Sequence, residues 1–126
     1  MDNDRLLTTT SLLAIVLLSL HFSDDIVRGI EPGNLESMGG VAILAFWTWA
    51  TLVLARTRWA CGILFVGALF AAAMPVLHLR GKGVGGAFAA SDGAFFSIWL
   101  LFALGTVGVF ALVLSARGLL ARRVTP

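Results

Sequence analysis

The sequence predicts an all-α integral membrane protein in which four transmembrane helices form an up-down-up-down bundle. Four long stretches contain no Lys, Arg, Asp or Glu, and each is roughly the length needed to cross about 30 Å of hydrocarbon. Hydrophobic residues make up 59% of the chain and charged residues 13%, about half the charged share of a soluble domain. The mean hydropathy of +0.95 agrees with this class. Because backbone polar groups in lipid must pair within their own segment, these spans are predicted to be helices.

The four predicted spans leave room for a single domain over residues 1–126. They cover about residues 6–22, 38–55, 59–79 and 93–116. The first span follows the segment MDNDR, which carries two acids against one Arg. Since a secretory signal peptide needs a basic start, we interpret the first stretch as a retained span.

The connections and the small residues predict how the helices pack. Pro32-Gly33 marks a turn after the first span, and the short link at 56–58 makes the second and third helices antiparallel neighbours. Small residues let membrane helices approach closely. The third span carries a small-residue face that ends in a histidine, and the fourth carries two glycines one turn apart: Gly67, Ala71, Met74 and His78, then Gly105 and Gly108.

The distribution of Lys and Arg predicts that both termini are cytoplasmic. In that orientation most basic residues lie inside, as the positive-inside rule requires. The inner set is Arg5, Arg56, Arg58, Arg117, Arg122 and Arg123, and the outer set is Arg28, Arg80 and Lys82. The usage of Ala, Gly and Arg is compatible with a GC-rich bacterial source, so we expect a multi-pass protein of the cell (inner) membrane of a bacterium.

A polar cluster is predicted at the outer end of the bundle. If the first helix continues past its span, His21, Asp24, Asp25 and Arg28 lie at i, i+3, i+4 and i+7, along one helical face. His78 ends the third span at a comparable depth, and its small-residue face predicts that it points into the bundle. We expect Pro75, one turn earlier, to bend the helix end.

One interpretation of this cluster is a site for a divalent metal ion such as zinc. Imidazole and carboxylate groups are the ligands that zinc shares with similar transition metals, and a carboxylate one turn from a histidine fixes its tautomer. Asp92 opens the fourth span on the same side of the membrane. The candidate metal ligands are His21, Asp24, Asp25, His78 and Asp92.

Two other interpretations of the cluster stay open. His21 and His78 stand at similar depth on two helices of a bundle, as bis-histidine haem ligation requires. Histidines and acids at helix ends are also what any membrane protein shows where its spans meet the headgroups. In that case Asp92 caps the fourth helix, and Asp24 and Asp25 pair with Arg28.

The remaining residues indicate no reaction. Gly81-Lys82-Gly83 and the glycines that follow lack the strand and helix of a phosphate-binding loop, and no basic run interleaves with aromatics, which excludes nucleic acid as a partner. The single cysteine, Cys61, cannot form an intramolecular disulfide. Without a catalytic motif, we expect a small subunit or homo-oligomer that works through helix contacts. Its expected partners are the lipid bilayer and either itself or another membrane protein.

In size and topology alone the chain resembles the small multidrug resistance transporters. Those proteins carry a glutamate within their first helix, whereas here the first span contains no acid and Asp24 lies beyond it. The resemblance therefore covers no motif. A small proton-coupled transporter is a further alternative, after the metal-binding and haem-binding proteins.

Overall fold

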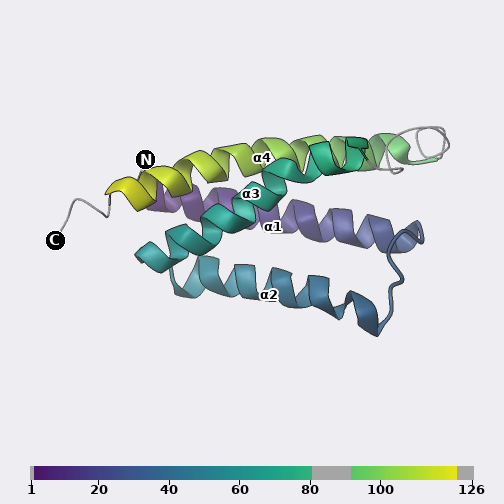
Figure 1. Ribbon diagram of the computed structural model, residues 1–126, viewed down its shortest axis with the longest axis horizontal. Coiled ribbons are helices and arrows are strands. Elements are labelled where there is room, and N and C mark those ends of the chain that lie inside the picture. Colours follow the sequence, from purple (N-terminus) through teal and green to yellow (C-terminus); the bar gives the residue numbers. More distant parts are fainter. Residues whose placement is uncertain (1, 81–91, 122–126) are drawn as a thin grey trace.

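The computed structural model describes residues 2–80 and 92–121. In this part of the chain four long helices pack as a bundle (Figure 1). They are α1 (Asn3–Val27), α2 (Met38–Val53), α3 (Arg58–Arg80) and α4 (Ala94–Ala121), and a 3-10 turn, η1 (Leu35–Ser37), precedes α2. The glycine-rich loop with Lys82 lies outside the described residues, as do Arg122 and Arg123.

All four helices are long and apolar enough to cross a membrane, which confirms the predicted all-α class and provides one candidate span for each predicted stretch. Of the four helices α2 is the shortest, and it reaches membrane length only with η1, as Leu35–Val53. Large apolar side chains such as Val16, Phe70 and Phe110 are exposed on the outside of the bundle. Such a surface would be exceptional on a soluble protein.

The first helix extends well past its predicted span, to Val27. Two residues later comes Gly29, whose φ of 70° is the left-handed conformation that glycine adopts without a Cβ penalty. The N–H of Gly29 donates to the carbonyl of Ile26, and the N–H of Ile30 donates to that of Asp25, the bond pattern of a Schellman motif. Asp24 and Asp25 therefore lie on helix rather than in the following loop.

The closest helix contact joins α3 and α4, which run in opposite directions (Figure 1). A Cβ atom at Gly108 would lie 2.4 Å from the backbone nitrogen of Ala72, and one at Gly105 would lie 2.5 Å from the Cγ atom of Pro75. The predicted close approach at these two glycines is confirmed.

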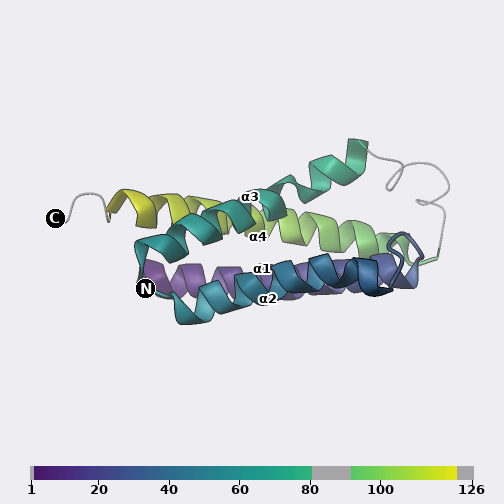
Figure 2. The same ribbon diagram turned by 60° about the horizontal axis from the view of Figure 1, so that its bottom comes forward.

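Pro75 lies inside α3, which bends in its second half (Figure 2), as expected where proline removes a backbone donor.

The core runs along the centre of the bundle, where Leu100, Leu104, Ala14 and Ala71 are almost fully buried. Trp47 of α2 joins this core by lying against Gly67 of α3, where a Cβ would come within 2.7 Å of the indole. α2 otherwise lies on the flank of the bundle, away from α4 (Figures 1 and 2).

Candidate metal centre

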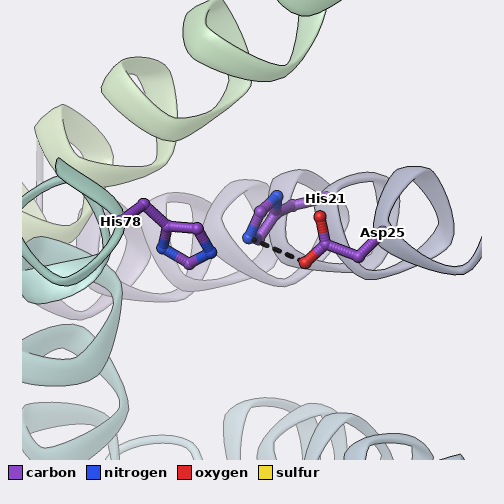
Figure 3. A group of neighbouring side chains, drawn as sticks. All are labelled: His21, Asp25 and His78. Carbon is purple, nitrogen blue, oxygen red and sulfur yellow. Dashed lines mark ion pairs between the residues drawn. The ribbon is translucent and has the colours of Figure 1, made fainter. Parts of the chain in front are cut away.

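Two helices far apart in the sequence bring the two histidines into contact. His21 lies near the end of α1 and is 4% exposed, and His78 lies near the end of α3. Their ring centroids are 4.8 Å apart with an interplanar angle of 73°, an edge-to-face contact. The two imidazoles and Asp25 point toward one another between the helices (Figure 3).

Asp25 follows His21 by one turn of α1 and supplies the carboxylate of the group. The His21 Nε2 atom lies 3.4 Å from the Asp25 Oδ2 atom, and the Asp25 side chain is 13% exposed. This contact requires α1 to remain helical through residue 25, because only then do positions i and i+4 share a face. The Schellman motif closes α1 only after residue 25, and it therefore leaves His21 and Asp25 on the same helical face.

His78 is held by its own helix in the orientation that a metal ligand needs. Its Nδ1 atom lies 3.0 Å from the carbonyl oxygen of Met74, one turn earlier in α3. Because a carbonyl only accepts, this bond requires the proton on Nδ1, and in the neutral imidazole Nε2 is then the nitrogen with a free lone pair. Metal-bound histidines commonly donate their second N–H to a backbone carbonyl in this way.

His21, Asp25 and His78 can each direct one ligand atom to a common point. The three atoms all lie within 4.8 Å of one another. Two ligands of a tetrahedral zinc ion with bonds of 2.0–2.1 Å are about 3.4 Å apart, which is the separation already present between His21 and Asp25. A side-chain adjustment of roughly 1.5 Å or less would bring all three atoms to zinc distance.

The Nδ1 atom of His21 is buried and has no hydrogen-bond partner among the described residues. A buried polar atom without a partner is costly. His21 therefore differs from His78, since its second ring nitrogen is not held by a carbonyl within the described part of the chain.

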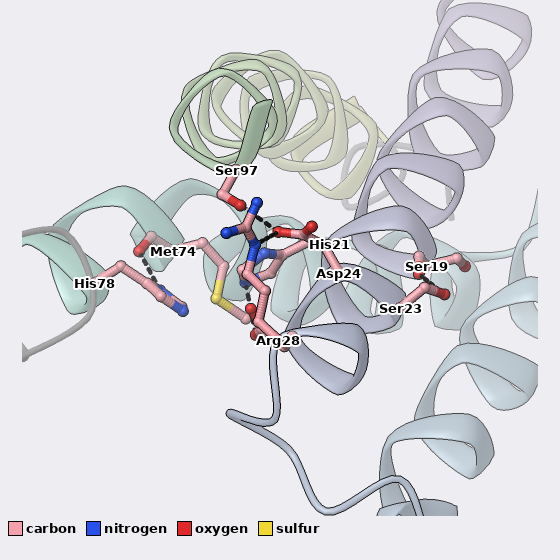
Figure 4. Close-up of polar contacts among 9 residues, drawn as sticks. Ser19, His21, Ser23, Asp24, Arg28, Met74, His78 and Ser97 are labelled. Atoms are coloured by element: carbon pink, nitrogen blue, oxygen red, sulfur yellow. Dashed lines mark hydrogen bonds and ion pairs between the residues drawn. The ribbon is translucent and has the colours of Figure 1, made fainter. Parts of the chain in front are cut away.

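Asp24 lies outside this group and joins α1 to α4 instead. Its Oδ2 atom accepts a hydrogen bond from the Arg28 Nε atom at 2.8 Å and another from the Ser97 hydroxyl (Figure 4). The same guanidinium donates through Nη1 to the backbone carbonyl of Asp92 at 3.2 Å. These contacts form a separate polar link between the end of α1 and the start of α4.

Asp92 takes part in that link through its backbone, while its side chain is exposed. Of the five ligands predicted from sequence, His21, Asp25 and His78 are brought together, and Asp24 and Asp92 are not. The metal role of each residue stays a prediction.

Sequence reasoning missed two partners of the polar cluster. Ser97 lies within an apolar span, and a single serine there gives no signal that it will meet an acid on another helix. The carbonyl of Met74 could have been found, since an acceptor four residues before a helical histidine is within reach of its Nδ1 atom.

Comparisons with protein families, with curated proteins and with solved structures found no match to this chain.

Proposed function

We propose that this chain is a four-span membrane protein that binds a divalent transition-metal ion, such as zinc, through His21, Asp25 and His78. The observation that carries the proposal is the convergence of three ligand atoms from α1 and α3 to within 4.8 Å. Two imidazoles and one carboxylate form a donor set that zinc accepts. A buried set of this kind is also better explained by a bound cation than by solvation, because the group lies largely out of water.

The geometry supports a metal ion more strongly than haem. A haem bound by two histidines would lie between their rings, with one imidazole on each face. Here the ring centroids are 4.8 Å apart and the edge of one ring meets the face of the other, so a macrocycle cannot enter between them. The carboxylate of Asp25 beside His21 also supports a small cation.

Three protein ligands leave one position of a tetrahedral ion for water or another molecule. This is the pattern of zinc sites that bind an exchangeable ligand, whereas sites with four protein ligands are closed. A metal in this position would also join α1 to α3 directly. We therefore propose that the protein acts through these three residues, and that helix packing and any self-association hold them in position.

The proposed orientation places the metal at the outer face of a bacterial inner membrane. α1 begins and α4 ends at the same end of the bundle (Figure 1), and Arg5, Arg56, Arg58 and Arg117 belong to the helix ends and the link at that end. The positive-inside rule makes this end cytoplasmic. The histidine end would then face outward, in an up-down-up-down bundle with both termini inside.

Zinc titration of the detergent-purified protein tests the proposal. Against a competing chromophoric chelator, we expect one zinc ion per chain, and we expect His21→Gln and His78→Gln each to lower the affinity at least about 10-fold, since even outer partners of metal ligands typically contribute this much. Ser97→Ala serves as the control, because it weakens the neighbouring α1–α4 link and leaves all three ligands in place.

The result that contradicts a metal site is equally direct. If both histidine variants bind zinc as tightly as the wild-type protein does, the metal lies elsewhere. Thermal unfolding of each variant in the same detergent, without zinc, shows whether a loss of affinity reflects a lost ligand or a lost fold. A variant that unfolds as the wild-type protein does and still loses zinc supports the assignment.

A further inference from the structure

A continuous apolar groove opens where α2 faces α1 and α3. It consists of two adjoining pockets of about 250 and 350 Å³ that share Ile43, Trp47, Gly67 and Phe70. We call this the α2 groove. Pockets that bind small molecules have volumes of about 300–1,000 Å³, so the two together are large enough to hold a ligand.

The α2 groove ends beside the proposed metal centre. Leu18 lines it and lies one turn before His21 on the same face of α1. Met74 also lines it, one turn before His78, and its carbonyl accepts the His78 Nδ1 proton (Figure 4). The two residues at this end of the groove are thus neighbours of the two histidines on their respective helices.

In the other direction the groove follows α3 into the membrane. Its lining on α3 extends from Met74 back to Ile63, which is about 16 Å along a helix that rises 1.5 Å per residue. This length is roughly half of the 30 Å hydrocarbon core. The groove is therefore about as long as one leaflet of hydrocarbon is deep, and it ends at Ile63, five residues after α3 begins at Arg58.

We propose that the α2 groove binds one acyl chain of a membrane lipid and places the polar end of that lipid beside His21, Asp25 and His78. The lining is apolar, the groove opens between helices that are long and apolar enough to cross a membrane, and its length of about 16 Å is roughly half of the hydrocarbon core, as expected for one acyl chain. A helix from a second copy is about 10–12 Å wide with its side chains and does not fit pockets of this size. The position of the polar end rests on the proposed metal site.

Photolabelling tests the inference in the full-length protein. The protein is reconstituted into phosphatidylcholine vesicles that contain phosphatidylcholine with a diazirine on one acyl chain. Labelled peptides are then identified by mass spectrometry. A diazirine near the ester should label the segments around Leu18 and Met74, and one near the terminal methyl should label the segment around Ile63. Both should exceed the labelling of the exposed outer face of α4 at Phe102 and Phe110.

Two variants of α2 separate binding in the groove from general contact with lipid. Ile43 lines both pockets, so Ile43→Trp should fill the groove and lower its labelling several-fold. Val41 is also exposed and lines neither pocket, so Val41→Trp should leave the labelling unchanged. Equal labelling in the two variants, or labelling that follows exposure alone, would overturn the inference, as would a crosslinked dimer without lipid in the groove.

The labelling is measured on protein stripped of metal with a chelator and again after zinc is added. Labelling of the groove in both states together with a flat zinc titration would refute the metal site and leave the lipid groove standing. A normal zinc titration with no excess labelling of the groove would refute the lipid groove and leave the metal site standing. The two proposals can therefore fail independently.

Discussion

At the scale of single residues, two adjacent aspartates have different partners. Asp25 faces His21, and Asp24 accepts hydrogen bonds from Arg28 and Ser97. Successive residues of an α-helix point about 100° apart, so neighbours on one helix can contact two different helices. This divergence is the reason why Asp25 is proposed as a metal ligand and Asp24 is not.

Replacing each aspartate with asparagine should separate these roles. Asp25→Asn removes a carboxylate ligand, so we expect zinc affinity to fall at least about 10-fold, with the fold retained. Asp24→Asn should keep zinc affinity and lower the free energy of unfolding by about 1–2 kcal/mol, because a hydrogen bond to a charged group is replaced by a neutral one. Chelator competition and thermal unfolding in detergent measure the two effects. The assignment of the carboxylates is wrong if Asp24→Asn loses zinc and Asp25→Asn does not.

At the scale of helices, the bundle depends on glycines where α4 crosses α3. The position that a Cβ would take at Gly108 is 2.4 Å from a backbone nitrogen of Ala72 and 2.7 Å from the carbonyl carbon of Ala71. Backbone atoms cannot turn aside as a side chain can. Any larger residue at this position must push the two helices apart.

A matched pair of glycine substitutions tests this contact. Gly108→Ala should lower the free energy of unfolding by about 1–3 kcal/mol, as overpacking of a close contact does. A Cβ at Gly62 of α3 would meet no atom within 4 Å, so Gly62→Ala should be neutral, or stabilising by up to about 1 kcal/mol from helix propensity. Thermal unfolding followed by circular dichroism compares the two variants. Equal stability would mean that the helices do not approach as closely as described.

The polar link between α1 and α4 has a similar dependence on glycine. Gly93 has a φ of 78°, and a Cβ there would lie 2.6 Å from the Arg28 Nη2 atom. A side chain at this position would strain the backbone and displace the guanidinium that contacts Asp24 and the carbonyl of Asp92. Gly93 therefore allows both the turn before α4 and the contacts of Arg28 with Asp24 and with the carbonyl of Asp92.

At the scale of the whole molecule, the proposed orientation in the membrane determines on which side the proposed metal site would lie. The histidines are at the end of the bundle opposite the start of α1, so cytoplasmic termini place them at the outer face. At that face, a metal ion and lipid headgroups could contact the histidines without crossing the hydrocarbon. The opposite orientation would turn the same group toward the cytoplasm.

Reporter fusions in a bacterial host test this orientation. We expect green fluorescent protein fused after Pro126 to fluoresce and alkaline phosphatase at the same position to be inactive, because the latter needs disulfides that form only outside the cytoplasm. Alkaline phosphatase fused after Glu36, in the connection between α1 and α2, should be active. The reverse pattern at both positions would place the termini outside.

Much of the fold could be predicted from the sequence because hydropathy and membrane thickness act locally. A run of apolar residues such as 59–79 requires no partner to be recognised as a span, and α3 covers it. The helix ends were less predictable. α1 extends to Val27 because backbone hydrogen bonds around Gly29 close it there, and a hydropathy pattern carries no such information.

For the site, the sequence by itself determined which residue types were available and at which end of the helices they lay. The tertiary structure alone decided that His21 meets His78, that Asp25 joins them and that Asp24 binds Ser97. The physical reason is that residue spacing defines a face of one helix, whereas this group combines side chains from two helices, α1 and α3. How α3 lies against α1 determines that His78 meets His21, and the sequence pattern does not carry that orientation.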